Sequence, residues 1–162
     1  MPASYEVEIT ASINAPVTQV WDIISDTGRY AEWVGIVDRV TDHHGIARKG
    51  QSYTEITRIM GPMRSHVTWT VREAYPQSWR LDSGAGLAPL KDAFTYFKFD
   101  ESPTAPDGSV TLLTYGLRYS IGWGPIEKLI QPALSRILKA GFRTSIRNLR
   151  RLIHNERRRV AA

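Results

Sequence analysis

Apolar and polar residues alternate along most of this chain, which is the pattern of strands that bury one face. In the first such run, from Tyr5 to Ile13, the apolar positions are Val7, Ile9, Ala11 and Ile13. Six further runs have the same period: Ile36–Asp42, Gln51–Met60, Arg64–Ala74, Trp79–Ser83, Ala93–Asp100 and Val110–Tyr119. Turn-forming segments separate them, so the spacing predicts an antiparallel meander of about seven strands.

A different period follows the first run, where apolar residues recur every three or four positions as in an amphipathic helix. Its apolar side consists of Val17, Val20, Trp21 and Ile24. Pro16 suits the first turn of this helix, and Asn14 is a candidate cap. A second short helix is expected just before Trp33.

The last third of the chain has the same helical period over some 28 residues, from Pro125 to Ile153. It predicts a long helix that buries one stripe. Pro132 lies within it and either kinks the helix or marks its true start. Strands and helices together give an α+β fold class.

Length and composition favour one domain over residues 1–162. The chain has no cysteine, which excludes disulfides, thiolate nucleophiles and most structural zinc sites. No dinucleotide fingerprint or metal-ligand spacing is present, so neither a cofactor nor a metal is predicted. The amino terminus does not resemble a signal peptide, and no apolar run could span a bilayer. A cytoplasmic location is therefore expected.

Short motifs between Ser12 and Val37 follow one another in a distinctive order. A strand end is followed by Ala15-Pro16, by a helix bearing Val20-Trp21, and then by Asp26, Tyr30 and Trp33 in the spacing Asp-x-x-x-Tyr-x-x-Trp. This order resembles the opening of the START-like (SRPBCC) superfamily, in its polyketide cyclase/dehydrase and lipid-transport group. Segments Thr111–Tyr119 and Ile146–Leu152 are similar to that group's last strand and terminal helix.

The resemblance covers the whole chain and implies a helix-grip fold. In this fold a curved antiparallel sheet wraps around the long C-terminal helix, and two short helices follow the first strand. The family uses the space between sheet and helix as an apolar cavity for lipids, polyketides, isoprenoids or other hydrophobic molecules. The expected partner is therefore a hydrophobic small molecule.

Phasing the strands identifies the side chains that would face this cavity. The predicted ligand-binding set is Trp33, Tyr53, Glu55, Trp69, Trp79, Phe97, Leu113, Tyr115 and Leu117, with Trp33 near the entrance. Rings with polar tips suit an amphipathic ligand, although the same pattern is compatible with a plain aromatic core.

Glu55 is the one catalytic candidate, because a carboxylate in an apolar cavity acquires a raised pKa suited to proton transfer. Alternatively, Glu55 pairs with Arg58 or Arg80, or a bulge turns it to solvent. His66 is expected to face solvent, and His43-His44 lie in a loop and make a poor metal site.

Three functions are compatible with these features. The first is binding, and with it transport, of a hydrophobic molecule. The second is a cyclase or dehydratase reaction that uses Glu55. The third is docking on an anionic membrane or an acidic carrier protein, because ten Lys or Arg against two Glu give the segment from Trp123 onward a net charge of +8. Nucleic acid is disfavoured, because no stacking platform or groove-reading helix accompanies this charge.

Overall fold

The computed structural model describes residues 3–58 and 62–162, and the strands in this part of the chain form one antiparallel sheet. They are β1 (Ser4–Ile13), β2 (Val37–Thr41), β3 (Ser52–Arg58), β4 (Arg64–Tyr75), β5 (Trp79–Ala85), β6 (Leu90–Glu101) and β7 (Thr111–Ile121). Their order across the sheet is β1-β7-β6-β5-β4-β3-β2. The predicted meander is confirmed, except that Ile59 and Met60, placed in the third strand, lie outside the described residues.

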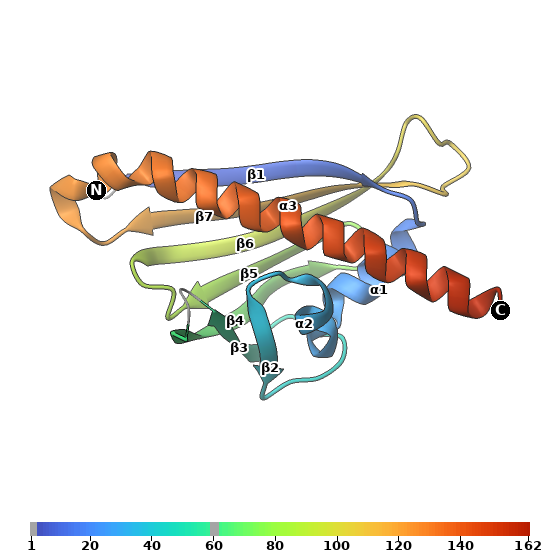
Figure 1. Ribbon diagram of the computed structural model, residues 1–162, viewed down its shortest axis with the longest axis horizontal. Coiled ribbons are helices and arrows are strands. Elements are labelled where there is room, and N and C mark those ends of the chain that lie inside the picture. Colours follow the sequence, from blue (N-terminus) through green and yellow to red (C-terminus); the bar gives the residue numbers. More distant parts are fainter. Residues whose placement is uncertain (1–2, 59–61) are drawn as a thin grey trace.

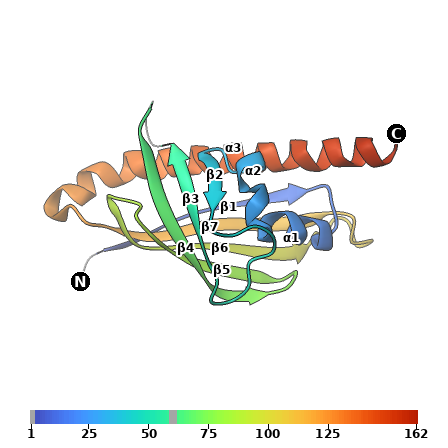
Figure 2. The same ribbon diagram turned by 90° about the horizontal axis from the view of Figure 1, so that it is seen from below.

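Three α-helices lie on one side of this sheet: α1 (Val17–Ser25), α2 (Tyr30–Trp33) and α3 (Glu127–Val160). Figure 1 shows α3 running across the sheet, with α1 and α2 grouped near one end. In the perpendicular view β3 and β4 rise from the other strands toward α3, so that the sheet curves around the helix (Figure 2). The helix-grip fold is confirmed.

The start of α1 differs from the prediction. Pro16 is not in the first turn but occupies the N-cap position, with an extended backbone (φ −66°, ψ 153°), and no side chain caps the helix. The Asn14 cap is therefore wrong. The reason is a tight turn before the helix, in which the Ala15 amide donates to the carbonyl of Ile13 over 2.8 Å.

The long helix α3 runs through Pro132, which therefore does not mark its start. Burial along α3 is uneven: its buried residues are Phe142, Ser145, Ile146, Leu149 and Ile153, and none precedes Phe142. In the first half Leu129 and Ile137 are exposed, and Ile130, Leu134 and Leu138 are half-buried. The C-terminal half of α3 thus anchors the helix to the core.

Strand faces follow the predicted alternation in β1, β3, β6 and β7. On β7 the inward residues Thr111, Leu113, Tyr115, Leu117 and Tyr119 are buried. Gly116 and Ser120, which lie on the opposite face of this strand, are buried as well. On β3, Tyr53, Glu55 and Thr57 point inward, whereas His66 on β4 is exposed as predicted.

The predicted phase of β5 is wrong. Arg80 and Asp82 point into the core with fully buried side chains, and Trp79 and Leu81 face outward. Trp79 instead stacks on Tyr96 on the outer face of the sheet, with ring centroids 5.5 Å apart, and its indole N–H donates to Glu73 over 2.7 Å. The inward charges are tolerated because they pair with each other.

Candidate functional site

An apolar pocket lies between the curved sheet and α3. Its enclosed volume is about 80 Å³. The walls are Tyr30, Trp33, Val34, Ile36, Tyr53, Glu55, Thr57, Val67, Trp69, Leu87, Thr95, Phe97, Tyr115, Leu117, Leu138 and Phe142. Ile36 is exposed, and Leu87 and Leu138 are half-buried, so the mouth lies between α3 and the loops that carry Ile36 and Leu87.

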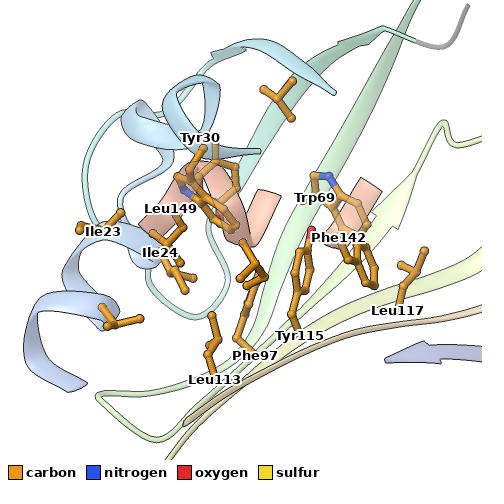
Figure 3. Close-up of a cluster of buried hydrophobic side chains, with 14 of the residues drawn as sticks. Ile23, Ile24, Tyr30, Trp69, Phe97, Leu113, Tyr115, Leu117, Phe142 and Leu149 are labelled. Carbon is orange, nitrogen blue, oxygen red and sulfur yellow. The ribbon is translucent and has the colours of Figure 1, made fainter. Parts of the chain in front are cut away.

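Stacked aromatic rings form one wall of the pocket. Tyr115 on β7 lies between Phe97 on β6 and Phe142 on α3, with ring centroids 4.6 Å and 4.0 Å away. Figure 3 shows Trp69, Tyr115 and Phe142 converging from three different elements. Because these rings come from both sheet and helix, the fold itself sets the shape of the wall.

Trp69 owes its position to a glycine on the neighbouring strand. Gly84 on β5 is paired directly with Trp69 on β4. A β-carbon at Gly84 would approach Cζ3 of the indole to 2.5 Å, which is closer than any side chain permits. The bare backbone of β5 therefore provides the surface on which the Trp69 ring lies.

Seven of the nine predicted ligand-binding residues line this pocket: Trp33, Tyr53, Glu55, Trp69, Phe97, Tyr115 and Leu117. Leu113 is fully buried but packs in the core beyond the pocket wall. Trp79 faces away, as described above. The predicted place of Trp33 at the entrance is also wrong, because its side chain is 0% exposed and packs against Tyr30, Phe97 and Tyr115.

Glu55 is buried in the pocket wall, at 8% exposure. The alternatives that it pairs with an arginine or turns to solvent are both wrong. Within the described residues Arg58 pairs with Asp38, Arg80 pairs with Asp82, and no ion pair includes Glu55. Burial raises the pKa of Glu55 to about 7, an effect that the Trp69 indole N–H reduces and the charge of Asp82 reinforces. Near neutral pH this carboxyl can therefore either donate or accept a proton.

A buried ion pair lies behind the pocket wall. The Arg80 guanidinium contacts both carboxylate oxygens of Asp82 at 2.7–3.1 Å and donates to the carbonyl of Ser25, the last residue of α1, over 3.2 Å. The Tyr53 hydroxyl donates to Asp82 over 2.7 Å and lies 3.4 Å from the hydroxyl of Tyr30. The pair thus fixes two tyrosines of the pocket. This role was not predicted, because inward Trp79 and Leu81 would put Arg80 and Asp82 on the outer face of β5.

The raised pKa of Glu55 makes stability depend on pH. The ordinary glutamate value is 4.5, so between about pH 4.5 and pH 7 the unfolded chain loses the proton while the folded chain keeps it. Stability should fall with rising pH through this interval, by about 3 kcal/mol in total. Glu55→Gln lacks this loss. We therefore expect the free energy of unfolding of Glu55→Gln, relative to that of wild type, to be about 3 kcal/mol higher at about pH 8 than at about pH 4. Urea unfolding at the two pH values measures this difference.

Asp22→Asn, on the exposed side of α1, is the control for loss of one carboxylate. A Glu55→Gln difference that stays constant across the pH range would show that Glu55 ionises normally in the folded protein.

The sequence matches the family model for polyketide cyclase/dehydrase and lipid transport over residues 4–154. The chain belongs to this family. Both activities in the family's description act on hydrophobic small molecules, so membership implies that the protein binds one. No protein of curated function matches the sequence.

Several solved structures share the fold of this chain. The Zhui aromatase/cyclase from Streptomyces sp. R1128 has a TM-score of 0.74 at 15% identity, over 96% of each chain. Protein Ms6760 from Mycobacterium smegmatis has a TM-score of 0.67 at 21% identity, over 93% of this chain and 92% of its own. DynU16, from the dynemicin biosynthetic locus, has a TM-score of 0.60 at 19% identity, over 92% of this chain and 47% of its own. At such low sequence identities the similarity shows a shared fold and nothing more.

Two further observations concern metals and membranes. In residues 3–58 and 62–162, no three His, Asp or Glu side chains come together in a way that could hold a metal ion. In the same residues of this family member, no helix combines the length and the apolar character required to cross a membrane.

Proposed function

We propose that this protein binds a hydrophobic small molecule that carries a few polar groups, in the pocket between the sheet and α3. The observation that carries the proposal is the pocket wall itself: stacked rings from β6, β7 and α3, with one buried carboxyl, Glu55, among them. Ligand sites in proteins combine largely apolar walls with few, well-placed polar groups in this way.

The size of the pocket constrains how a ligand enters. An enclosed volume of about 80 Å³ is well below the roughly 300–1,000 Å³ typical of ligand sites. The half-buried side chains at the mouth, Leu87 and Leu138, must therefore move when a ligand of ordinary size binds. Leu138 belongs to the part of α3 before Phe142, which has no buried residue, and this makes it the easier wall to displace.

Native mass spectrometry of protein purified from its own host tests the proposal directly. We expect a retained hydrophobic molecule, released on unfolding. Binding of Nile red provides a second measurement: Leu117→Trp, which fills the pocket, should weaken it at least about tenfold. Leu112→Trp, on the opposite face of β7, should leave it unchanged. Saturable binding that both variants retain would place the ligand elsewhere, provided that both variants still unfold cooperatively.

A second candidate function is a cyclisation or dehydration of a polyketone, which the pKa of about 7 at Glu55 favours. Its carboxylate would remove a proton from a carbon between two carbonyl groups. The resulting enolate carbon would attack another carbonyl of the same molecule, and the carboxylic acid would return its proton to the alkoxide that forms. For dehydration, the carboxylate would then remove the second proton from the same carbon and give it to the departing hydroxyl group, which leaves as water. Turnover of a poly-β-keto substrate that Glu55→Gln abolishes would support this reaction. Tight binding without turnover would leave only the carrier function.

A third candidate is docking on an anionic lipid surface through α3. Its exposed cations include Arg143, Arg147, Arg151 and Arg157–Arg159, and each basic residue near such a surface contributes about 1 kcal/mol. Co-sedimentation with phosphatidylserine vesicles, lost when Arg157–Arg159 are neutralised, would support docking. Equal, negligible binding to neutral and anionic vesicles would show that these arginines only solvate the helix.

A further inference from the structure

Two tryptophans in the pocket wall bury an indole N–H that has no partner. Trp33 comes from α2 and Trp69 from β4, and both are at most 6% exposed. Among residues 3–58 and 62–162, neither Nε1 atom makes a hydrogen bond of ordinary geometry, although the Trp69 N–H is near enough to Glu55 to lower the pKa of that carboxyl. Burying a donor without an acceptor destabilises the folded protein, so such groups are rare and call for a specific explanation.

Two other polar groups of the pocket wall do find partners. The Tyr53 hydroxyl donates to Asp82 over 2.7 Å, and the Thr95 hydroxyl donates to the carbonyl of Gly116 over 3.1 Å. Outside the pocket, the Trp79 indole N–H donates to Glu73. In the described residues the buried side-chain polar atoms left without a hydrogen bond are Ser25 Oγ, Trp33 Nε1, Trp69 Nε1 and Tyr119 Oη. Of these, the two indole nitrogens belong to residues of the pocket wall.

The chemistry of the two indole N–H groups defines which kind of ligand atom could accept their hydrogen bonds. An indole N–H only donates, so its partner must be an acceptor such as a carbonyl, ether or hydroxyl oxygen. None of the described residues that line the pocket is a lysine or an arginine, so they offer no counter-ion for a carboxylate or phosphate. The acceptor should therefore be neutral, and the adjoining stacked rings favour a flat ring system over an acyl chain.

We propose that Trp33 and Trp69 are the specificity-determining residues of this pocket and donate hydrogen bonds to neutral oxygen acceptors on a ring-shaped ligand. This inference rests on the proposed binding function and deepens it. A hydrocarbon of the same shape would leave both donors unpaired. The pocket should therefore bind the oxygen-bearing ligand more tightly than the hydrocarbon. Sites built around a hydrogen bond reject analogues that lack the group more strongly than apolar sites reject analogues that differ in size.

The matched probes are 1-tetralone and tetralin, which share a two-ring skeleton and differ by one carbonyl oxygen. Isothermal titration calorimetry gives the ratio of their dissociation constants. For the wild-type protein we expect tetralone to bind at least about tenfold more tightly than tetralin. Trp33→Phe and Trp69→Phe keep an aromatic ring and remove the N–H, and at least one of them should bring the ratio close to one. Trp79→Phe, on the outer face, is the control and should keep the wild-type ratio.

The outcomes separate this inference from the function on which it rests. Equal binding of the two probes to the wild type, or a preference that both pocket variants retain, would overturn the role of the indoles while leaving a hydrophobic site in place. The wild-type comparison needs no variant, so it holds even if the fully buried Trp33 does not tolerate substitution. If neither probe nor Nile red binds the wild-type protein, the proposed function and the inference both fail.

Discussion

Asp82→Ala is expected to destabilise the protein by about 3–5 kcal/mol, because it leaves the buried Arg80 guanidinium without its counter-charge. Both side chains of this pair are fully buried. Arginine stays protonated in proteins, so it cannot relieve the loss by giving up its proton. The substitution also removes the acceptor of the Tyr53 hydroxyl. Urea unfolding of the variant and the wild type at one pH measures the change.

The double variant Arg80→Met with Asp82→Leu separates the cost of a lone charge from the value of the pair. It should cost less than the two single substitutions added together, because no unpaired charge remains. Some loss should persist, since the Ser25 carbonyl and the Tyr53 hydroxyl lose partners. Strictly additive effects would mean that Arg80 and Asp82 stabilise the fold independently of each other.

Trp21→Ala should cost about 3–5 kcal/mol, as truncations of large buried side chains do. Trp21 is 5% exposed on the inner side of α1, and the edge of its ring meets Phe99 with centroids 5.2 Å apart. Its removal would leave a cavity between α1 and β6. Thr18→Ala on the exposed side of α1 is the matched control and should stay within about 0.5 kcal/mol of wild type. A loss under about 1 kcal/mol for Trp21→Ala would show that the core refills the space.

The sequence predicted the strands and the long helix because their periods are regular and their faces differ clearly. In β7, Leu113 and Leu117 lie on one face, and the exposed Arg118 lies on the other, so the inward face followed directly. The long helix was equally clear from the three- and four-residue spacing of its apolar positions. The family resemblance then supplied the curvature of the sheet, which no local pattern in the sequence reveals.

The candidate site was predicted less completely, and β5 shows why. Hydrophobicity places Trp79 and Leu81 inside, but the register with β6 pairs Arg80 with the inward Phe97 and Asp82 with the inward Thr95. A register shift between Val71 and Glu73 on β4 accompanies this phase. Burial of two opposite charges is stable only because each satisfies the other. That compensation depends on three-dimensional contacts which alternation along one strand does not encode.

Trp33 and the volume of the pocket were beyond prediction for a related reason. A tryptophan at the end of a short helix fits a cavity mouth as well as a core, and only its contacts with Phe97 and Tyr115 decide between them. Side chains fill most of the space that the fold encloses, so the remaining volume depends on every rotamer in the wall.

Because α3 is anchored unevenly, the free energy of opening the pocket is separate from the free energy of unfolding the whole protein. Opening the part of α3 before Phe142, which has no buried residue, should require only a local fluctuation, whereas releasing Ile146 and Leu149 requires disruption of the core. Amide hydrogen exchange along this one helix would then be graded, fast before Phe142 and slow beyond it. Access to the interior is accordingly governed by the weak end of the helix and global stability by the strong end. Variants that stabilise the core can therefore leave the rate of ligand exchange unchanged.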